Sequence, residues 1–342
     1  MTLDLQALHR VSLVPLAFRR SRTDADAPAV PMEHPLGGRA VGAGTGLFAN
    51  QLLAPAGAVF DGWSSSAGVQ TQRHGCVRYT SDGQWLHGCA EIDDVAFEGG
   101  LHAAAQQAYT DLFDVLAQSR SPHLLRLWNY IAHINAPDTD GVERYRHFNA
   151  GRQQAFIDAR RSAFDGTPAA CALGTQEGPL RVFFLAGPRA PLAIENPRQI
   201  SAYRYPASYG ARSPTFSRAA LADVGAGRQA LFISGTASIV GHTTLHLGDV
   251  RRQTEESLAN MAAVREVAAL RSGAEFAAPE LIYTVYVRHR SDLAVVREVF
   301  EQHVGVQSTA AREAVYLQAD ICRAELLVEI EAHAFVHQES PV

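Results

Sequence analysis

The segment Leu327–Val336, LVEIEAHAFV, places two carboxyl groups and an imidazole on one side of a predicted strand. Because strand side chains alternate between two faces, Glu329, Glu331 and His333 share one face and small apolar side chains form the other. If the polar face is turned to water, its charges are merely solvated, and composition favours this arrangement. If it faces another part of the protein, burial raises the pKa of a carboxyl group, which can then act as a general acid near neutral pH.

Two further residues could contribute to the same site. Cys322 precedes a predicted four-residue turn, which would put its thiol on the face of Glu329. A lone cysteine is more often a small buried apolar residue than a nucleophile, so we favour a role in the wall of the site. Gly235 interrupts the predicted strand FISGTAS. A glycine there marks a bulge or lets a ligand approach the backbone, and the bulge is the preferred interpretation.

The segment Asn196–Ala219 combines four arginines with three tyrosines. Arginine binds carboxylates through paired hydrogen bonds, and tyrosine supplies a ring wall and a hydroxyl donor. The segment is therefore either a clamp for an anionic, cyclic small molecule or a surface loop with solvated arginines. Arg152, in ERYRHFNAGR, is a further candidate for binding such a molecule, or an ordinary exposed helix residue.

The histidine pairs do not predict a metal site. His242 with His246, and His333 with His337, fall in strand-like sequence, where residues four apart are separated by about 13 Å. That separation is too large for two ligands of one ion. The chain also has no HExxH, P-loop or GxGxxG motif. We therefore expect neither a metal nor a nicotinamide, flavin or nucleotide cofactor.

Hydrophobic periodicity places these residues in two similar halves. In the first half it predicts a helix over Leu101–Leu116, a strand over Leu124–Ile134 and a helix over Glu143–Phe164. The second half repeats this order, with the predicted elements Gln229–Leu247 (strand-like runs), Val250–Leu270 (helix), Leu281–Val287 (strand), Leu293–Val304 (helix) and a hairpin of Val315–Cys322 with Leu327–Val336.

We therefore predict an α+β fold of two related modules, each a mixed sheet covered on one face by helices. An irregular N-terminal segment, 1–45, precedes the first module, 46–185. The Arg/Tyr-rich pocket segment, 186–227, leads to the second module, 228–342.

Composition excludes several classes of protein. Of the 342 residues, 47% are hydrophobic and 19% are charged, which supports an ordinary core. A net charge of −5 argues against a nucleic-acid partner, and four scattered cysteines argue against a disulfide framework. No apolar run approaches the about 20 residues of a membrane helix, and no secretory signal is evident. We expect a cytoplasmic protein without a membrane partner.

Two levels of resemblance bear on these residues. FISGTAS, QTEESLANMAAV, LIYTVYVRHRSDL and LVEIEAHA resemble the Rid/YjgF proteins, enamine/imine deaminases with a chorismate-mutase-like α+β fold, whose first EIEA glutamate corresponds to Glu329. A longer match resembles the chorismatase family and covers about residues 45–337. It rests on the segments LRLWNYIAHIN, ERYRHFNAGR, NPRQISAYRYPASYGARSPTFSRA, FISGTASIVGH and YLQADICRAELLVEIEA.

The resemblance to chorismatases implies a cofactor-free enzyme acting on chorismate, a small ring with two carboxylates. In that family a glutamate at the position of Glu329 protonates the enolpyruvyl methylene carbon, and pyruvate is released. Subtypes with glycine and cysteine at the positions of Gly235 and Cys322 form 3-hydroxybenzoate through an arene oxide, and some also release 4-hydroxybenzoate. Hydrolytic subtypes, which give a dihydroxycyclohexadiene carboxylate, tend to have alanine at the first position. The resemblance therefore favours hydroxybenzoate formation, in the mixed subtype.

The resemblance also implies binding residues and alternatives. It places Arg204, Tyr209 and Arg152 in matching motifs, and it aligns Arg312 with the arginine that Rid proteins use on a substrate carboxylate. A monomer or small homo-oligomer is expected. Three functions are open: a chorismate-cleaving enzyme, a Rid-like deaminase, and a non-catalytic binding module for an aromatic acid. The N-terminal half and the Arg/Tyr segment favour the first.

Overall fold

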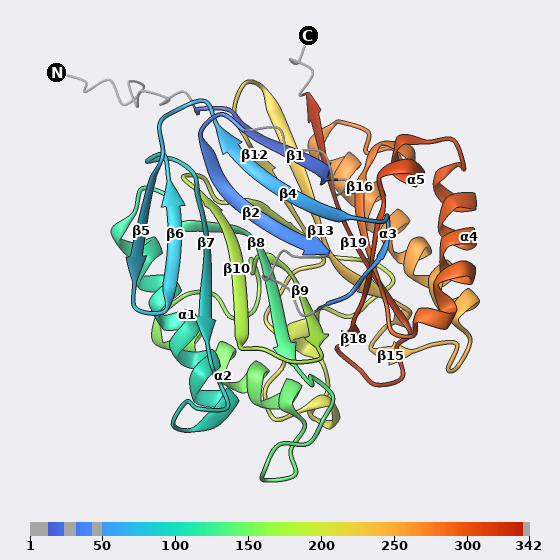
Figure 1. Ribbon diagram of the computed structural model, residues 1–342, viewed down its shortest axis with the longest axis horizontal. Coiled ribbons are helices and arrows are strands. Elements are labelled where there is room, and N and C mark those ends of the chain that lie inside the picture. The colour runs from blue at the N-terminus through green and yellow to red at the C-terminus, as the bar shows by residue number, and fades with distance from the viewer. Residues whose placement is uncertain (1–12, 24–31, 43–49, 338–342) are drawn as a thin grey trace, which may run out of the picture.

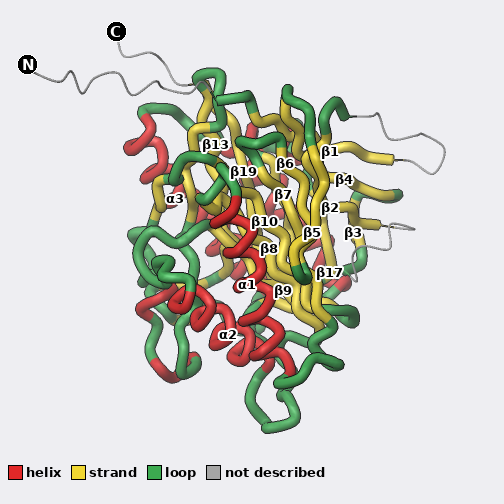
Figure 2. Tube along the Cα trace, turned by 90° about the vertical axis from the view of Figure 1, so that its left-hand side faces the viewer, coloured by secondary structure: helices red, strands yellow, loops and turns green. Residues whose placement is uncertain are grey.

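The computed structural model describes residues 13–23, 32–42 and 50–337. Its first seven-stranded sheet has the order β18-β9-β8-β10-β7-β6-β5, with β8 and β9 parallel and the other neighbours antiparallel. The helices α1 (Gly100–Gln118) and α2 (Arg144–Asp158) lie across one face of this sheet (Figure 2). The strands are β5 (Gln70–His74), β6 (Val77–Ser81), β7 (Leu86–Ile92), β8 (His123–Ala132), β9 (Ala169–Thr175), β10 (Leu180–Gly187) and β18 (Asp320–Ile321).

The second seven-stranded sheet has the order β11-β12-β13-β19-β16-β17-β3 and contains one parallel pair, β16 with β17. Its strands are β3 (Leu52–Ala54), β11 (Leu192–Ile194), β12 (Ala219–Asp223), β13 (Arg228–Ala237), β16 (Ile282–Val287), β17 (Val315–Gln318) and β19 (Val328–His337). Its outer face carries the helices α3 (Val250–Ser272), α4 (Leu293–Val304) and α5 (Thr309–Glu313) (Figure 1). The remaining short elements are β14 (Ile239–Val240), β15 (Thr243–Thr244) and the 3₁₀ turns Ala202–Arg204, Ala207–Tyr209, Ala278–Glu280 and Arg290–Asp292.

The two sheets face each other, so the layers run helix, sheet, sheet, helix. Alternation along β8 shows this arrangement, since Trp128 and Tyr130 belong to the core between the sheets and Leu127 and Ile131 belong to the core under α1 and α2. The predicted α+β fold of two mixed sheets, each covered on one face by helices, is confirmed. Among the described residues, no helix is long and apolar enough to cross a membrane.

A small third sheet corrects the prediction of an irregular N-terminal segment. It consists of β1 (Leu16–Thr23), β4 (Ala58–Ser65) and β2 (Pro35–Gly42), in the order β1-β4-β2. The arginine and glycine content of β1 and β2 is typical of loops, which is why strands were not predicted there. In the structure Arg39 of β2 is only 7% exposed, because it pairs with acidic groups in the interior. The rest of the predicted segment, 1–12, 24–31 and 43–45, lies outside the described residues.

Two local predictions were wrong. The helix predicted to run to Phe164 ends at Asp158, and Arg160 has a φ of +52°, which a helix cannot continue. The predicted C-terminal hairpin is absent, because β17 pairs with β16 and β3, while β19 pairs with β13 and β16. The chain after β17 crosses to the other sheet, where β18 pairs with β9.

Each large sheet has an edge strand from the other half of the chain. The first sheet ends in β18, from the C-terminal half, and the second ends in β3, from the N-terminal half. The strands β11 and β12 fall within the predicted pocket segment, 186–227, yet belong to the second sheet. Each large sheet thus contains strands from more than one predicted segment. Sheet membership alone therefore does not divide the chain, and the four-part division stays a proposal.

Candidate active site

Glu329 lies near the start of β19, in the middle of the second sheet. It stands opposite Ala237 of β13 and Tyr286 of β16, and only 3% of its surface is exposed. The predicted faces of the strand are confirmed, since Val328 and Ile330 pack in the core under the helices. The polar face, however, points toward the first sheet, so the expectation that it faces water was wrong.

Burial sets the proton affinity of this carboxyl group. Desolvation, and next the negative charge of Glu331, raise the pKa of Glu329 to about 8, and the positive charge of Arg126 partly opposes them. Within the described part of the chain, Oε1 of Glu329 has no hydrogen-bond partner. The group is therefore protonated at neutral pH, and its acceptor oxygen is unpaired.

Gly235 lies against this carboxyl group. The register between β13 and β19 shifts between Ile233 and Thr236, so the predicted irregularity of the strand is confirmed. A Cβ atom on Gly235 would lie 1.9 Å from Oε1 of Glu329 and 3.0 Å from Cβ of Cys171. The bulge interpretation therefore holds, the space beside the glycine is taken by the acidic side chain, and close approach of a ligand to this backbone stays a proposal.

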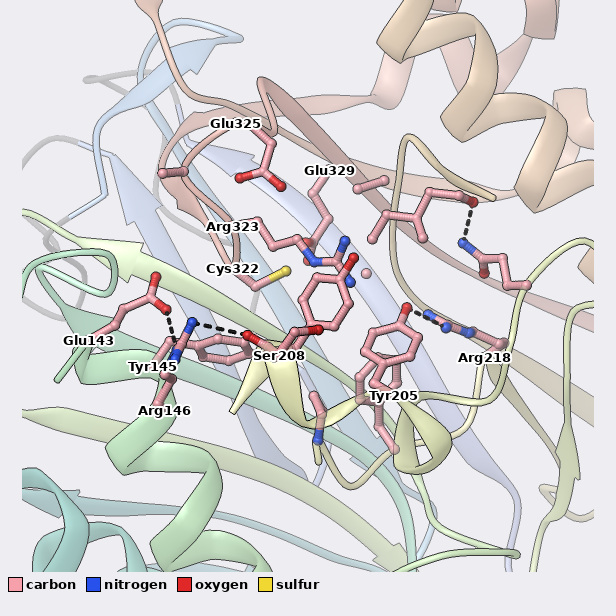
Figure 3. A pocket seen from close by; sticks show the side chains of 18 residues that line it. Glu143, Tyr145, Arg146, Tyr205, Ser208, Arg218, Cys322, Arg323, Glu325 and Glu329 are labelled. Carbon is pink, nitrogen blue, oxygen red and sulfur yellow. Dashed lines mark hydrogen bonds and ion pairs between the residues drawn. The ribbon is translucent and has the colours of Figure 1, made fainter. Parts of the chain in front are cut away.

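A cavity of about 300 Å³ opens beside Glu329, between the two modules (Figure 3). Its walls come from the N-terminal end of α2, the segment 199–218, β13 with the residues that follow it, and the loop before β19. Figure 3 shows acidic, basic and aromatic side chains gathered around this space. The residues that line the cavity include Glu143, Tyr145, Arg146, Tyr205, Ser208, Tyr209, Phe216, Arg218, Gly235, Cys322, Arg323, Glu325 and Glu329.

Cys322 lies in the cavity wall as a neutral thiol. Burial, followed by the charge of Glu329, raises the pKa of its thiol to about 12. A thiol with this pKa is not a nucleophile at neutral pH. Burial also raises the pKa of the neighbouring Tyr145 hydroxyl. Both side chains therefore present uncharged polar groups to whatever occupies the cavity.

The arginine–tyrosine segment forms one wall of the cavity, and the solvated-loop alternative describes only part of it, since Arg204 and Arg212 are exposed. Tyr209 stacks under the guanidinium of Arg323, whose carbon lies 4.0 Å from the ring centroid. Arg218 is 6% exposed and donates to the hydroxyl of Tyr205 over 2.8 Å. In the described chain, Nε of Arg218 and Nη2 of Arg323 are buried without hydrogen-bond partners. Such unpaired cationic donors beside a cavity are suited to an anion.

Arg152 lies behind the cavity, in a small inner chamber of about 30 Å³ that Glu329 and Cys322 also line. It is 1% exposed, so it is not an ordinary exposed helix residue. Its Nη2 donates to Asn149 over 2.7 Å, and its Nε has no partner among the described residues. A role in substrate binding stays a proposal for Arg152.

Two predicted binding residues lie elsewhere. Arg204 is exposed and stacks on Tyr203, and it does not line the cavity. Arg312 is exposed on α5, where it bonds to the carbonyl of Gln307 and the hydroxyl of Thr309. The alignment with Rid arginines failed here because α5 lies on the outer side of the second sheet.

Sequence reasoning missed Arg323 and Tyr145 as cavity residues. Arg323 follows Cys322 directly, and adjacency to a candidate site residue is the signal that could have found it. In the described chain, the group of acidic and histidine side chains close enough to share an ion is His74, Asp111 and Asp114, none of which lines the cavity.

Comparisons with known proteins converge on one family. A family model described as "Chorismatase FkbO/Hyg5-like, N-terminal" matches residues 61–186. A chorismatase of Streptomyces rapamycinicus is 39% identical over 281 residues, 79% of this chain and 80% of the relative. A 3-hydroxybenzoate synthase of Streptomyces hygroscopicus is 34% identical over 290 residues, 82% of this chain and 83% of the relative. A chorismatase crystal structure superposes with a TM-score of 0.81 at 30% identity, covering 95% of this chain and 99% of that one.

Proposed function

Because the chain belongs to the chorismatase family, we propose that it is an enzyme that cleaves chorismate into pyruvate and a hydroxybenzoate. The observation that carries this proposal is the buried, protonated Glu329 beside a cavity with unpaired arginine donors. Chorismate has two carboxylates on a small framework, and it contains a vinyl ether that needs a proton donor to break.

In the first step the carboxyl group of Glu329 donates its proton to the methylene carbon of the enolpyruvyl group. The electrons of the carbon–carbon double bond form the new C–H bond, and an oxocarbenium ion results. A general acid must hold its proton until the substrate is bound, and the pKa of about 8 meets this requirement at neutral pH.

In the second step the ring hydroxyl oxygen attacks the adjacent ring carbon that bears the ether. The bond between this carbon and the ether oxygen breaks, and its electrons complete the ketone of pyruvate. The hydroxyl proton returns to the carboxylate of Glu329, which restores the acid. The arene oxide then opens and aromatises to 3-hydroxybenzoate, or by the alternative opening to 4-hydroxybenzoate. Atoms balance without water or a cofactor.

The surrounding residues have separate roles in this proposal. Arg218 and Arg323 bind carboxylates of the substrate, because both have buried donors without partners in the described chain. Tyr209 supports Arg323 from below and donates to the carbonyl of His242 over 2.7 Å, which fixes this wall. Cys322 and Gly235 shape the space around the ring and the acid.

Incubation of the purified enzyme with chorismate tests the proposal. Pyruvate is measured by a coupled assay, and the aromatic products are separated by chromatography. We expect equal amounts of pyruvate and hydroxybenzoate. Glu329→Gln preserves size and neutrality but has no acidic proton, and it should lower kcat by about 10²-fold or more. Undiminished pyruvate release by this variant would falsify the assignment of the acid.

The same assay separates the alternatives. A dihydroxycyclohexadiene carboxylate formed in place of hydroxybenzoate would identify a hydrolase. Binding of chorismate without pyruvate release would identify a non-catalytic binding module. Ammonia released from an enamine, with no turnover of chorismate, would identify a Rid-like deaminase.

A further inference from the structure

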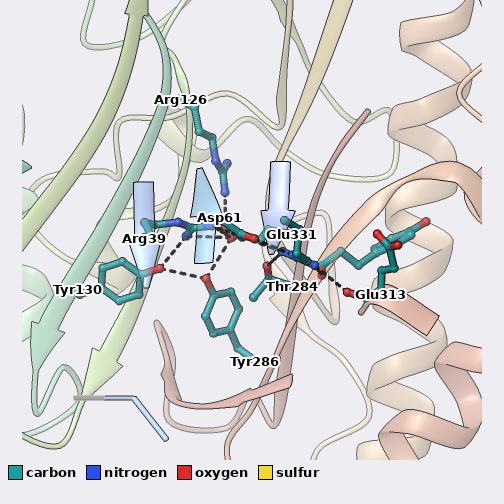
Figure 4. A network of polar contacts seen from close by, with 10 residues as sticks. Arg39, Asp61, Arg126, Tyr130, Thr284, Tyr286, Glu313 and Glu331 are labelled. Atoms are coloured by element: carbon teal, nitrogen blue, oxygen red, sulfur yellow. Dashed lines mark hydrogen bonds and ion pairs between the residues drawn. The ribbon is translucent and has the colours of Figure 1, made fainter. Parts of the chain in front are cut away.

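Glu331 lies two residues after Glu329, on the same face of β19, and the two carboxyl groups differ in their partners. Glu331 is 3% exposed, and it is bound by Arg39, Arg126 and the hydroxyl of Tyr286 (Figure 4). Arg39 contributes two nitrogens, each 3.2 Å from Oε1, and Tyr286 donates to the same oxygen over 3.1 Å. These cations keep the pKa of Glu331 below its usual value in spite of burial.

The arginines that bind Glu331 are themselves held in place. Arg39 stacks on Trp128 at 4.4 Å and donates to the hydroxyl of Tyr130 over 2.8 Å. It also lies 3.5 Å from Asp61, whose carboxylate Arg20 binds through two nitrogens. The result is a buried row of alternating charges, Arg20, Asp61, Arg39, Glu331 and Arg126, that ends beside Glu329.

The other groups around Glu329 are mostly neutral. Cys171 on β9, Cys322, Tyr145 on α2 and Tyr286 on β16 are titratable, and burial raises the pKa of each above its usual value. The charges that act on the pKa of Glu329 are those of Glu331 on its own strand, which raises it, and Arg126 on β8, which lowers it. Arg152 on α2 lines the inner chamber, and the outer cavity adds Glu143, Arg146, Arg218, Arg323 and Glu325.

We propose that Glu331 is a positioning residue whose fixed negative charge keeps Glu329 in its protonated form until substrate arrives. Arg126 and Arg39 make this possible, because they hold Glu331 as a carboxylate in a buried place where an isolated carboxylate would take up a proton. The proposal rests on the role of Glu329 as the acid in the proposed function.

The proposal also gives a function to the small N-terminal sheet. Arg39 lies on β2 and Asp61 on β4, so this sheet supplies one of the two guanidinium groups on Glu331. Arg126, from β8 of the first sheet, supplies the other. Residues from three sheets thus meet at the carboxylate of Glu331, which in this proposal controls the protonation of Glu329.

Two variants with opposite expected effects test the proposal. Glu331→Gln removes the anion and leaves the opposing cation Arg126 in place, so the titration midpoint of Glu329 should fall by about one pH unit or more. Arg126→Gln removes a cation, so the midpoint should rise by a similar amount. Arg126→Lys keeps the charge and should restore the midpoint to near the wild-type value. A purely structural role for these residues would not produce shifts of opposite sign.

Two readouts separate this proposal from the proposed function. In enzyme labelled with ¹³C at the glutamate Cδ, the signal lost in Glu329→Gln reports the titration of Glu329 without substrate. The descending limb of kcat/KM against pH reports the same group in the free enzyme through its activity. If the wild type fails to release pyruvate, the proposed function fails, and the NMR midpoints still decide the role of Glu331.

Asp61→Asn is the matched control. Like Glu331, Asp61 is a buried carboxylate bound by two arginines, so its loss disturbs folding in the same manner. It lies on the far side of Arg39, and we expect it to shift the midpoint of Glu329 by less than about 0.3 units. An unchanged or raised midpoint in Glu331→Gln would overturn the proposal, as would equal shifts in Glu331→Gln and Asp61→Asn. If Glu331→Gln does not fold, an unchanged midpoint in Arg126→Gln overturns it.

Discussion

Gly235 leaves open the space that the carboxyl group of Glu329 occupies, since a Cβ atom at position 235 would lie 1.9 Å from Oε1 of Glu329. The carbon of that carboxyl group would be 2.6 Å away, so both contacts are closer than van der Waals contact allows. The atoms in conflict are the end of the Glu329 side chain, so that side chain, and not the paired backbone of β13 and β19, would have to shift. The identity of residue 235 therefore controls where the acid points.

Gly235→Ala should move the carboxyl group of Glu329 away from its present place. We expect kcat for pyruvate release to fall by about tenfold or more, because a displaced acid transfers its proton less efficiently. The fraction of dihydroxycyclohexadiene carboxylate among the products should rise, because the altered cavity no longer favours attack by the ring hydroxyl. Chromatography of the products at matched conversion measures both effects.

Gly68→Ala is the control for that substitution. No described atom lies within 4 Å of a Cβ built on Gly68, and its backbone is not in the left-handed region. This variant should keep the wild-type rate and products. A Gly235→Ala enzyme with the same rate and products as Gly68→Ala would contradict the control of the acid by residue 235.

The pH dependence of the reaction should show one descending limb from Glu329. In the proposed mechanism the protonated form is the active one, and burial raises the pKa of this group to about 8. Because the active form disappears above that value, kcat/KM should be level on the acid side and fall about tenfold per pH unit beyond the limb. Pyruvate release at saturating coupling enzyme measures the profile. A limb that is equally present in Glu329→Gln would belong to another group.

The unfolding free energy of Glu329→Gln, compared with that of the wild type, should increase as pH rises. A carboxyl group whose pKa is about 8 in the folded state and about 4.5 in the unfolded state stabilises the fold most below pH 4.5. This contribution declines by about 1.4 kcal/mol per pH unit between the two values, because only the folded state holds the proton there. Glutamine does not titrate, so the difference in unfolding free energy between variant and wild type should grow between pH 5.5 and 7.5. Urea denaturation measures it, and a constant difference would show that Glu329 is not protonated in the fold.

Periodicity predicted the helices and most strands because each buries one regular apolar face. The predicted helix over Leu293–Val304 matches α4, and the one over Val250–Leu270 matches α3 to within two residues. The strand pairing could not be predicted in the same way. Ile321 pairs with Leu173 in the other sheet, and no local pattern distinguishes that partner from one in its own half.

The candidate site was predictable only in part. The shared face of Glu329 and Glu331 follows from the two-residue period of a strand, but which face meets the other sheet does not. Burial of that face decides whether Glu329 is an acid or a solvated carboxylate. Arg39 and Arg126 are 292 and 205 residues from Glu331 in the chain, so their pairing with it depends on the tertiary fold.

Arg323 and Arg204 should differ sharply in their effect on substrate binding, although both are arginines near tyrosines. Arg323 lines the cavity and has a buried Nη2 without a partner in the described chain, whereas Arg204 is exposed and stacks on Tyr203. Arg323→Met removes a cation that we propose to bind a substrate carboxylate, so KM for chorismate should rise about 10-fold to 100-fold with a smaller change in kcat. Arg204→Met should leave both constants within about twofold of the wild type. Steady-state pyruvate release measures both constants. An equal rise of KM in the two variants would contradict the prediction, because it would mean that the arginines act through the overall electrostatic potential of the protein and not through contact with the substrate.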